Sequence, residues 1–175
     1  MTNLPMVVGI SGASGAPYAL RLLQVLKTLG IPTHLVVSKS AARALKEELG
    51  VSLDEVRALA TANYSNNDMG AAIASGSFRT RGMIVMPCSI RTLSDVAYGT
   101  TDTLLSRAAD VVLKERRRLV LVVRETPLHQ GHLRSMLAAT ENGEGAAGLN
   151  CICCWGGGGS GQAGVPSSSF CWSTS

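Results

Sequence analysis

The stretch MVVGISGASGAPYALRLLQVLKTLG, residues 6–30, joins a short apolar run to a longer segment with helical spacing. The run at 6–10 is rich in β-branched residues, which predicts a buried strand. Apolar residues recur every three or four positions over 16–29, which predicts a helix. GISGASGAP at 9–17 holds three glycines and two serines where the strand passes into the helix. The stretch is therefore typical of the first half of a βα unit.

The same alternation continues along the chain. Further strands are predicted at 34–38, 83–87 and 119–123, and helices at 40–49, 53–61, 91–98, 102–116 and 131–140. Strands that are apolar throughout and separated by helices favour a parallel sheet covered on both faces. The predicted fold class is a doubly wound α/β domain, Rossmann-like or flavodoxin-like, with three layers. Its ligand should lie at the carboxyl ends of the strands.

The turn at 9–17 then has a candidate role. Its glycines allow close approach of a ligand, Pro17 suits a first helical turn, and free N–H groups at a helix start favour an anion such as phosphate. It is not a P-loop, because no Gly-Lys-Ser/Thr follows, and it lacks the glycine spacing of a dinucleotide fingerprint. The second strand ends in Ser38 instead of an acidic residue. The alternative is a tight turn that only packs the helix on the strand.

Three more polar stretches lie near strand ends. PCSIRT at 87–92 places Ser89, Arg91 and Thr92 after the third strand, and RETPLH places Arg124 and Glu125 after the fourth. SGSF at 75–78 precedes the third strand. Hydroxyls and a guanidinium at one sheet edge are suited to a phosphate or a polar ring edge. Each stretch alone is also consistent with an ordinary surface loop, and Arg124 with Glu125 with a solvated ion pair.

Composition narrows the function classes. The 175 residues are 46% hydrophobic, enough for one sizeable core. The net charge is +4, but the basic residues are scattered and lack interleaved aromatics, which argues against nucleic-acid binding and leaves a phosphorylated small molecule. No apolar run is long enough to span a bilayer and the first twenty residues lack a secretory pattern, so we expect a cytosolic protein.

Several motifs occur in the same order as in a known protein family. GISGASG, SGSF, PCSIRTL, SRAADVVLKERR and VRETPLH resemble those of the flavin prenyltransferases of the UbiX type, within the class of homo-oligomeric flavin-containing proteins, over about residues 5–140. The resemblance implies alkylation of reduced FMN by dimethylallyl phosphate at N5 and ring closure at C6. It also implies no metal, a trimer-based homo-oligomer with the dodecamer as one form, and a UbiD-type decarboxylase that uses the product in ubiquinone or aromatic acid metabolism.

The resemblance also assigns roles to residues. Four are implied near the chemistry: Ser14, Glu48, Lys114 and Glu125. FMN contacts are implied for Gly12, Ala13, Ser14, Ser38, Ser89, Ile90, Arg91, Thr92 and Arg124. The prenyl phosphate is implied to meet Ser75, Gly76, Arg107 and Lys114, some of them from a neighbouring subunit. The physical pattern agrees in part, because Arg107 and Lys114 are about two turns apart on one helix and share a face. Whether Glu125 or the released phosphate takes the C6 proton stays open.

Other residues with reactive side chains are given structural roles. His129 and His132 lack an acidic or cysteine partner at ligand spacing, and His34 stands apart from both, so no metal site is expected. Cys88 is expected to be a small packed residue.

The chain changes character after Thr140. Residues 141–175 hold nine of the nineteen glycines, four of the five cysteines and both tryptophans, without helical or strand periodicity. We expect a flavin-binding domain at 1–140 and a disordered or frame-altered tail at 141–175, with the last strand and helix of the family missing. A zinc site from Cys151, Cys153, Cys154 and Cys171 is disfavoured because the paired CxxC spacing is absent. One alternative is therefore an FMN-binding protein that has lost prenyl transfer because of this tail. A second is a flavin-dependent cysteine decarboxylase, which shares the fold; that branch usually carries an Ala-Asn-Thr version of the CSIRT segment, so Ser89 to Thr92 argue against it.

Overall fold

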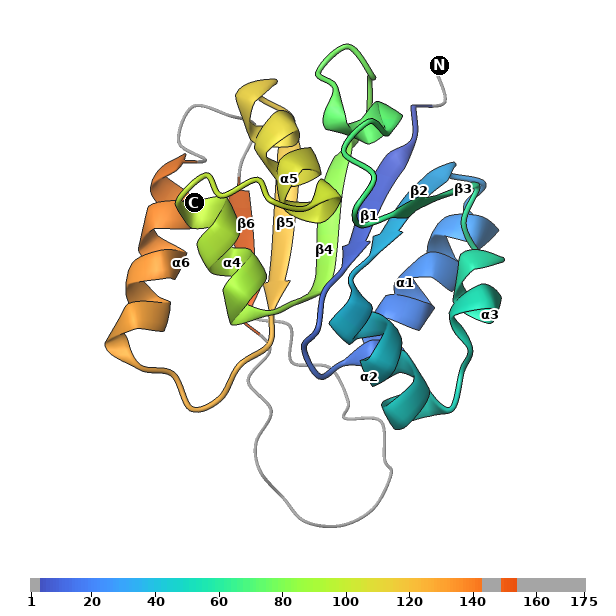
Figure 1. Cartoon of the computed structure of the whole chain (residues 1–175), viewed down its shortest axis with the longest axis horizontal. Coiled ribbons are helices and arrows are strands. Elements are labelled where there is room, and N and C mark those ends of the chain that lie inside the picture. The colour runs from blue at the N-terminus through green and yellow to red at the C-terminus, as the bar shows by residue number, and fades with distance from the viewer. Residues whose placement is uncertain (1–3, 143–148, 154–175) are drawn as a thin grey trace.

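The computed structural model describes residues 4–142 and 149–153. In this part of the chain, six strands form one sheet in the order β3-β2-β1-β4-β5-β6, and every pairing is parallel (Figure 1). The strands are β1 (Met6–Ile10), β2 (Thr33–Val37), β3 (Ala62–Ser65), β4 (Gly82–Cys88), β5 (Arg118–Val123) and β6 (Leu149–Cys153). The strand order reverses between β1 and β4, and this switch point is where an open α/β sheet binds its ligand.

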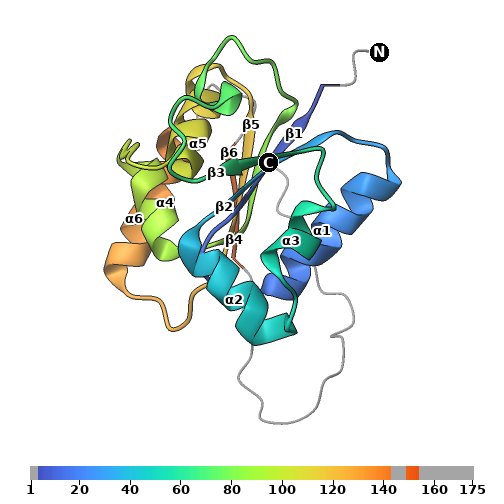
Figure 2. The same cartoon turned by 45° about the vertical axis from the view of Figure 1, so that its right-hand side comes forward.

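Helices cover both faces of the sheet. They are α1 (Ala16–Thr28), α2 (Lys39–Leu49), α3 (Leu53–Arg57), α4 (Ile90–Ala97), α5 (Leu104–Lys114) and α6 (Gln130–Asn142), with a 3₁₀ turn η1 (Ala72–Ala74). Figure 2 shows α1 and α3 on one side of the strands and α4, α5 and α6 on the other. The predicted doubly wound α/β fold is confirmed.

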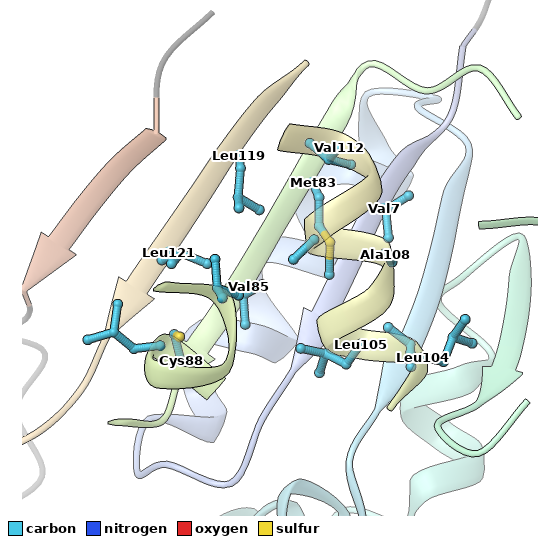
Figure 3. Close-up of a cluster of buried hydrophobic side chains, with 14 of the residues drawn as sticks. Val7, Met83, Val85, Cys88, Leu104, Leu105, Ala108, Val112, Leu119 and Leu121 are labelled. Carbon is cyan, nitrogen blue, oxygen red and sulfur yellow. The ribbon is translucent and has the colours of Figure 1, made fainter. Parts of the chain in front are cut away.

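Side-chain alternation along β1 divides the core into two halves. Val8 packs on the side of α1 and α2, whereas Val7 packs on the side of α5. Figure 3 shows Val7, Met83 and Val85 from adjacent strands pointing toward Leu105 and Ala108 of α5. Because the central strands β1 and β4 are largely buried on both faces, their sequences are continuous apolar runs and not alternating ones.

Hydroxyl residues cap four of the helices. Ser38 caps α2, Ser52 caps α3, Ser89 caps α4 and Thr103 caps α5, and each side chain accepts a hydrogen bond from a backbone N–H of the first turn. Two of these, Ser38 and Ser89, are the hydroxyls that the sequence predicts as ligand contacts at strand ends. Their capping bonds fix where the first turns of α2 and α4 begin.

The structure corrects several predicted bounds. β3, with the sequence ANYS, is absent from the sequence prediction because it is short and half polar, and its pairing with β2 is what makes it a strand. Helix α3 ends at Arg57 and not at 61, because the chain turns there to enter β3. Helix α5 spans 104–114 and not 102–116, since Thr103 is its cap. None of the described helices is long and apolar enough to cross a membrane.

A sixth strand corrects the prediction that the sheet ends at 119–123. Leu149–Cys153 pairs in parallel with β5 from Leu119↔Leu149 to Val123↔Cys153. The strand arises because β5 would otherwise present unpaired N–H and C=O groups at the sheet edge, and a neighbouring segment satisfies them without any strong pattern of its own. The expectation of a tail without regular structure is therefore wrong at 149–153. At 143–148 and 154–175, which include Cys154 and Cys171, that expectation lies outside the described residues.

Candidate functional site

Backbone contacts bring the predicted strand ends together at one edge of the sheet. Ser38 N donates to Ile10 O at 2.9 Å, and Arg124 N donates to Cys88 O at 3.1 Å. Ser11 ties the two central strands, because its Oγ donates to Pro87 O at 3.1 Å and accepts from Ser89 N at 2.7 Å. The segments after β1, β2, β4 and β5 are therefore neighbours, as the parallel topology predicts.

The first turn of α1 already carries an anion. The Glu48 carboxylate accepts hydrogen bonds from Ala16 N at 2.9 Å and Gly15 N at 3.1 Å. A carboxylate stabilises a helix N-terminus by the same electrostatics that would attract a phosphate. Two N–H groups at the end of the 9–17 turn are thus already bonded within the chain, and the phosphate position predicted for this turn stays a prediction.

A cavity of about 550 Å³ lies beside this turn, between the first turns of α2 and α4. This volume is within the range of small-molecule sites, about 300–1,000 Å³. Of the residues predicted for FMN, five line the cavity: Gly12, Ser38, Ser89, Arg91 and Thr92. Sequence reasoning missed the other lining residues: Lys39, Ser40, Arg43, Asn66, Asp95, Thr103, Leu105 and Ser106.

The α2 end of the cavity has the chemistry of an anion site. Ser38 Oγ accepts from Ala41 N at 3.1 Å, which leaves the N–H groups of Lys39 and Ser40 at the helix start without an intrahelical partner. The exposed Lys39 and Arg43 side chains add positive charge at the same end. A signal for Lys39 and Ser40 exists in the sequence, because they follow a predicted strand end directly.

Gly12 shapes this end of the cavity. A Cβ added at Gly12 would overlap the side chain of Ser40. Glycine therefore lets the loop after β1 lie directly against the first turn of α2. Asn66 follows β3, and it was missed because β3 itself was missed.

Asp95 places a carboxylate in the opposite wall. Its Oδ2 lies 4.0 Å from Arg91 Nε. Burial raises the pKa of Asp95, the Arg91 guanidinium lowers it in part, and Asp102 raises it further. The Arg91 side chain is 85% exposed. Its guanidinium is thus available to a ligand, while Asp95 restrains its direction.

The other predicted FMN residues lie at the same edge but do not line the cavity. Ala13 and Ser14 are in the loop after β1, and Ser14 is exposed. Ile90 packs against the core from the first turn of α4. Arg124 and Glu125 are half-buried after β5, where Glu125 Oε1 accepts a hydrogen bond from Thr126 N at 3.1 Å.

The predicted phosphate residues form a separate group. Arg107 Nε donates to Ala74 O at 3.3 Å, beside Ser75, and Lys114 Nζ lies 3.7 Å from Glu115 Oε1. A Cβ added at Gly76 would overlap the Glu115 carboxylate, so Gly76 lies against the end of α5. Figure 1 shows η1 and the end of α5 at the edge opposite to the loops that follow β1, β4 and β5. Within one chain, Ser75, Gly76 and Lys114 are therefore apart from the cavity, whereas Arg107 follows Ser106, which lines it.

Cys88 and the histidines have structural surroundings. Cys88 is fully buried in the core, as predicted (Figure 3). His129 and His132 stack with ring centroids 3.6 Å apart. Among residues 4–142 and 149–153, no cluster of three histidine, cysteine or acidic side chains is placed to hold a metal.

Comparisons with known proteins identify the family of this chain. The sequence pattern of the Flavoprotein family matches residues 1–141. The flavin prenyltransferase UbiX of Thauera aromatica is 58% identical over 138 residues, which cover 79% of this chain and 71% of the relative. The chain belongs to the UbiX-type flavin prenyltransferases of the flavoprotein family.

Another relative and two solved structures are also similar to this chain. The flavin prenyltransferase UbiX of Escherichia coli K12 is 59% identical over 139 residues, covering 79% of this chain and 74% of its own. The solved structure of AnUbiX in complex with FMN and dimethylallyl pyrophosphate superposes with a TM-score of 0.80 at 47% identity, over 86% of this chain and 76% of that one. A dodecameric FMN-dependent UbiX-like decarboxylase from Escherichia coli O157:H7 gives 0.81 at 46% identity, over 86% and 80%.

The cysteine decarboxylase alternative is much less similar. The FMN-dependent cysteine decarboxylase SpaF superposes with a TM-score of 0.67 at 14% identity, over 86% of this chain and 83% of that chain. Such a likeness shows a shared fold alone. The UbiX-type prenyltransferases are therefore the family that both sequence and fold support.

Proposed function

We propose that this protein transfers the dimethylallyl group of dimethylallyl phosphate to N5 of reduced FMN and closes the new ring at C6, giving prenylated FMN and free phosphate. One observation carries the proposal within the structure: Gly12, Ser38, Ser89, Arg91 and Thr92, predicted as flavin contacts from three different stretches of the sequence, line a single cavity.

The donors around the cavity suit FMN. The phosphate fits the α2 end, where the N–H groups of Lys39 and Ser40 and the charges of Lys39 and Arg43 converge. Because Gly12 has no side chain, the loop after β1 packs closely against Ser40, and no side chain at position 12 fills the α2 end of the cavity. Ser89, Arg91 and Thr92 at the start of α4 supply polar groups for the ring system. We assign residues 1–140 to this flavin-binding unit.

The flavin supplies the nucleophilic N5 and C6 atoms. The residues of the chain have the task of stabilising the departing phosphate, since the prenyl carbon becomes cationic as the bond to oxygen breaks. Arg107 and Lys114 supply positive charge, and Ser75 and Gly76 supply a hydroxyl and a backbone N–H next to them. Either Glu125, which follows β5 at the carboxyl edge of the sheet, or the released phosphate accepts the C6 proton in this proposal. Ser14 and Glu48 lie at the same turn, where Glu48 holds the start of α1.

Oligomerisation is part of the proposal. Ser75, Gly76 and Lys114 are apart from the cavity of their own chain, so a neighbouring copy would have to present them to that cavity. A trimer-based assembly, up to a dodecamer, would provide such contacts. We further propose a cytoplasmic location and a UbiD-type decarboxylase of ubiquinone or aromatic acid metabolism as the user of the product.

A flavin analysis tests the function. Purified protein is incubated anaerobically with FMN, dithionite and dimethylallyl phosphate, and the extracted flavin is examined by mass spectrometry. The expected product is heavier than reduced FMN by one dimethylallyl unit less the displaced hydrogen. Bound but unchanged FMN would instead support the alternative of a flavin-binding protein without transfer.

A further inference from the structure

A guanidinium holds the loop that carries Ser75 and Gly76. Arg117 lies between α5 and β5, and its side chain is only 17% exposed. Its Nη1 donates to Phe78 O at 2.7 Å and its Nη2 donates to Gly76 O at 2.7 Å. The two bonds therefore fix the carbonyl groups of Gly76 and Phe78. These residues lie between η1 and β4, in a stretch that belongs to no helix or strand. Charged donors make such bonds short and strong.

Glu115 also contacts the loop that carries Ser75 and Gly76. A Cβ added at Gly76 would overlap the Glu115 carboxylate, so the loop backbone lies directly against that group. Glu115 Oε2 is 3.9 Å from Arg117 Nη2, and Glu115 Oε1 is 3.7 Å from Lys114 Nζ. One short turn thus connects the ammonium of Lys114 to the loop through Glu115 and Arg117. The turn and the loop form one unit.

Only arginine fits both bonds. The fork of the guanidinium presents two N–H groups in fixed directions, which matches two carbonyl oxygens two residues apart. A lysine at 117 would offer three N–H donors on one atom, without the fixed spacing of the guanidinium fork, and would hold the two carbonyls less well. The neighbouring Arg116 has the same charge, but its side chain is exposed, which makes it a matched reference for the effect of charge alone.

We propose that Arg117 is a positioning residue for the prenyl phosphate: it holds Ser75 and Gly76 in the geometry that receives the phosphate, beside Lys114. The inference rests on the proposed function, because that function assigns Ser75, Gly76 and Lys114 to the phosphate. Arg117 itself touches neither the phosphate nor the flavin. Loss of Arg117 should therefore weaken the binding of the prenyl substrate and leave the binding of FMN unchanged.

The experiment compares Arg117→Gln and Arg117→Lys with Arg116→Gln and the parent chain. Arg117→Gln should raise KM for dimethylallyl phosphate about tenfold or more, while kcat at saturation stays within about threefold, because the barrier after docking is little changed. Arg117→Lys should recover part of the loss. Arg116→Gln, which removes the same charge one residue away, should behave as the parent, and FMN titration should give one affinity for all four proteins.

Other results would overturn the inference. An unchanged KM in Arg117→Gln would show that the loop keeps its geometry without the two bonds. A joint fall of FMN affinity, melting temperature and kcat would show a general structural role. If Arg117→Gln does not fold, Arg117→Lys decides between these outcomes. If the parent makes no prenylated flavin, the proposed function fails, and calorimetric binding of dimethylallyl phosphate to the same FMN-loaded proteins still tests the role of Arg117: equal binding by parent and variants would refute it.

Discussion

The carboxylate of Glu48, at the end of α2, accepts a hydrogen bond from Ala16 N at 2.9 Å at the start of α1. The same oxygen accepts from Gly15 N at 3.1 Å. Two helices on one face of the sheet are joined at the point where the glycine-rich turn ends. This contact fixes the position of the turn, and it occupies the N–H groups of Gly15 and Ala16 that an anionic ligand would otherwise meet.

Replacement of Glu48 by alanine should destabilise the fold. The variant loses two hydrogen bonds and the favourable charge at a helix N-terminus, which together are worth about 1–2 kcal/mol in the free energy of unfolding. Urea unfolding of the parent and Glu48→Ala measures the difference. Glu47→Ala is the matched control, because Glu47 pairs only with the exposed Arg43 at 2.7 Å and that pair should contribute less than about 0.5 kcal/mol. If both variants lose the same free energy of unfolding, the bonds of Glu48 to the start of α1 do not stabilise the fold.

An extra negative charge at position 38 should weaken FMN binding. Aspartate caps a helix as well as serine does, so Ser38→Asp should keep α2 and place a carboxylate where the FMN phosphate is proposed. Repulsion at close range should lower the affinity at least about tenfold in a fluorescence titration. Ser52→Asp makes the same change at the cap of α3, away from the cavity, and should bind FMN as the parent does. Parent-like affinity in Ser38→Asp would mean that the phosphate lies elsewhere.

Removal of the Glu125 charge should affect turnover and spare flavin binding. Glu125→Gln keeps the size of the side chain and its contact with Thr126 N, but it no longer accepts a proton. Prenyl transfer should fall about a hundredfold, the usual cost of losing one preorganised charged group. Single-turnover formation of prenylated FMN gives the rate. Glu141→Gln on the exposed side of α6 is the control, and a variant at 125 with parental turnover would exclude this carboxylate from the mechanism.

His34 should make stability depend on pH. Burial lowers the pKa of His34 below its ordinary value of 6.5, so the folded state binds fewer protons than the unfolded state. Its contribution is present above pH 6.5 and is lost as pH falls through 6.5 toward the folded-state pKa. His34→Gln should flatten this decline in unfolding experiments between about pH 7 and 5.

Tyr64 provides the control for His34. The Tyr64 hydroxyl lies 2.8 Å from His34 Nδ1, and Tyr64→Phe removes that contact while keeping the ring that helps to bury the imidazole. Because burial is the cause of the shift, Tyr64→Phe should keep the decline with pH. If the decline disappears in Tyr64→Phe and persists in His34→Gln, burial of His34 is not its origin.

Truncation after Asn142 should destabilise the domain. It removes β6, so the backbone N–H and C=O groups of β5 that point toward β6 lose their partners. The free energy of unfolding should fall by at least about 2 kcal/mol. Thermal melts of the full and truncated chains compare the two. A truncated chain with the melting temperature and solubility of the full chain would show that β6 adds nothing to stability.

The sequence alone predicts most of the fold. The apolar runs at 6–10 and 119–123 identify buried parallel strands, because a strand covered on both faces needs no polar positions. The hydroxyls at Ser38 and Ser89 are also readable, since capping residues follow strand ends in βα units. The five motifs from GISGASG to VRETPLH carry the family, and both the family pattern and the relatives agree with it.

Tertiary structure decides what has no local signal. The edge strands β3 and β6 exist through pairing with β2 and β5, and neither ANYS nor LNCIC predicts a strand from its own residues. The partner of the α1 N-terminus, Glu48, is more than thirty residues away, as are the two carbonyls that Arg117 holds. A sequence pattern reports the burial and turning of neighbouring residues, because those depend on local spacing. Which charge meets which backbone group across the sheet depends on how distant segments pack, and only the folded chain fixes that.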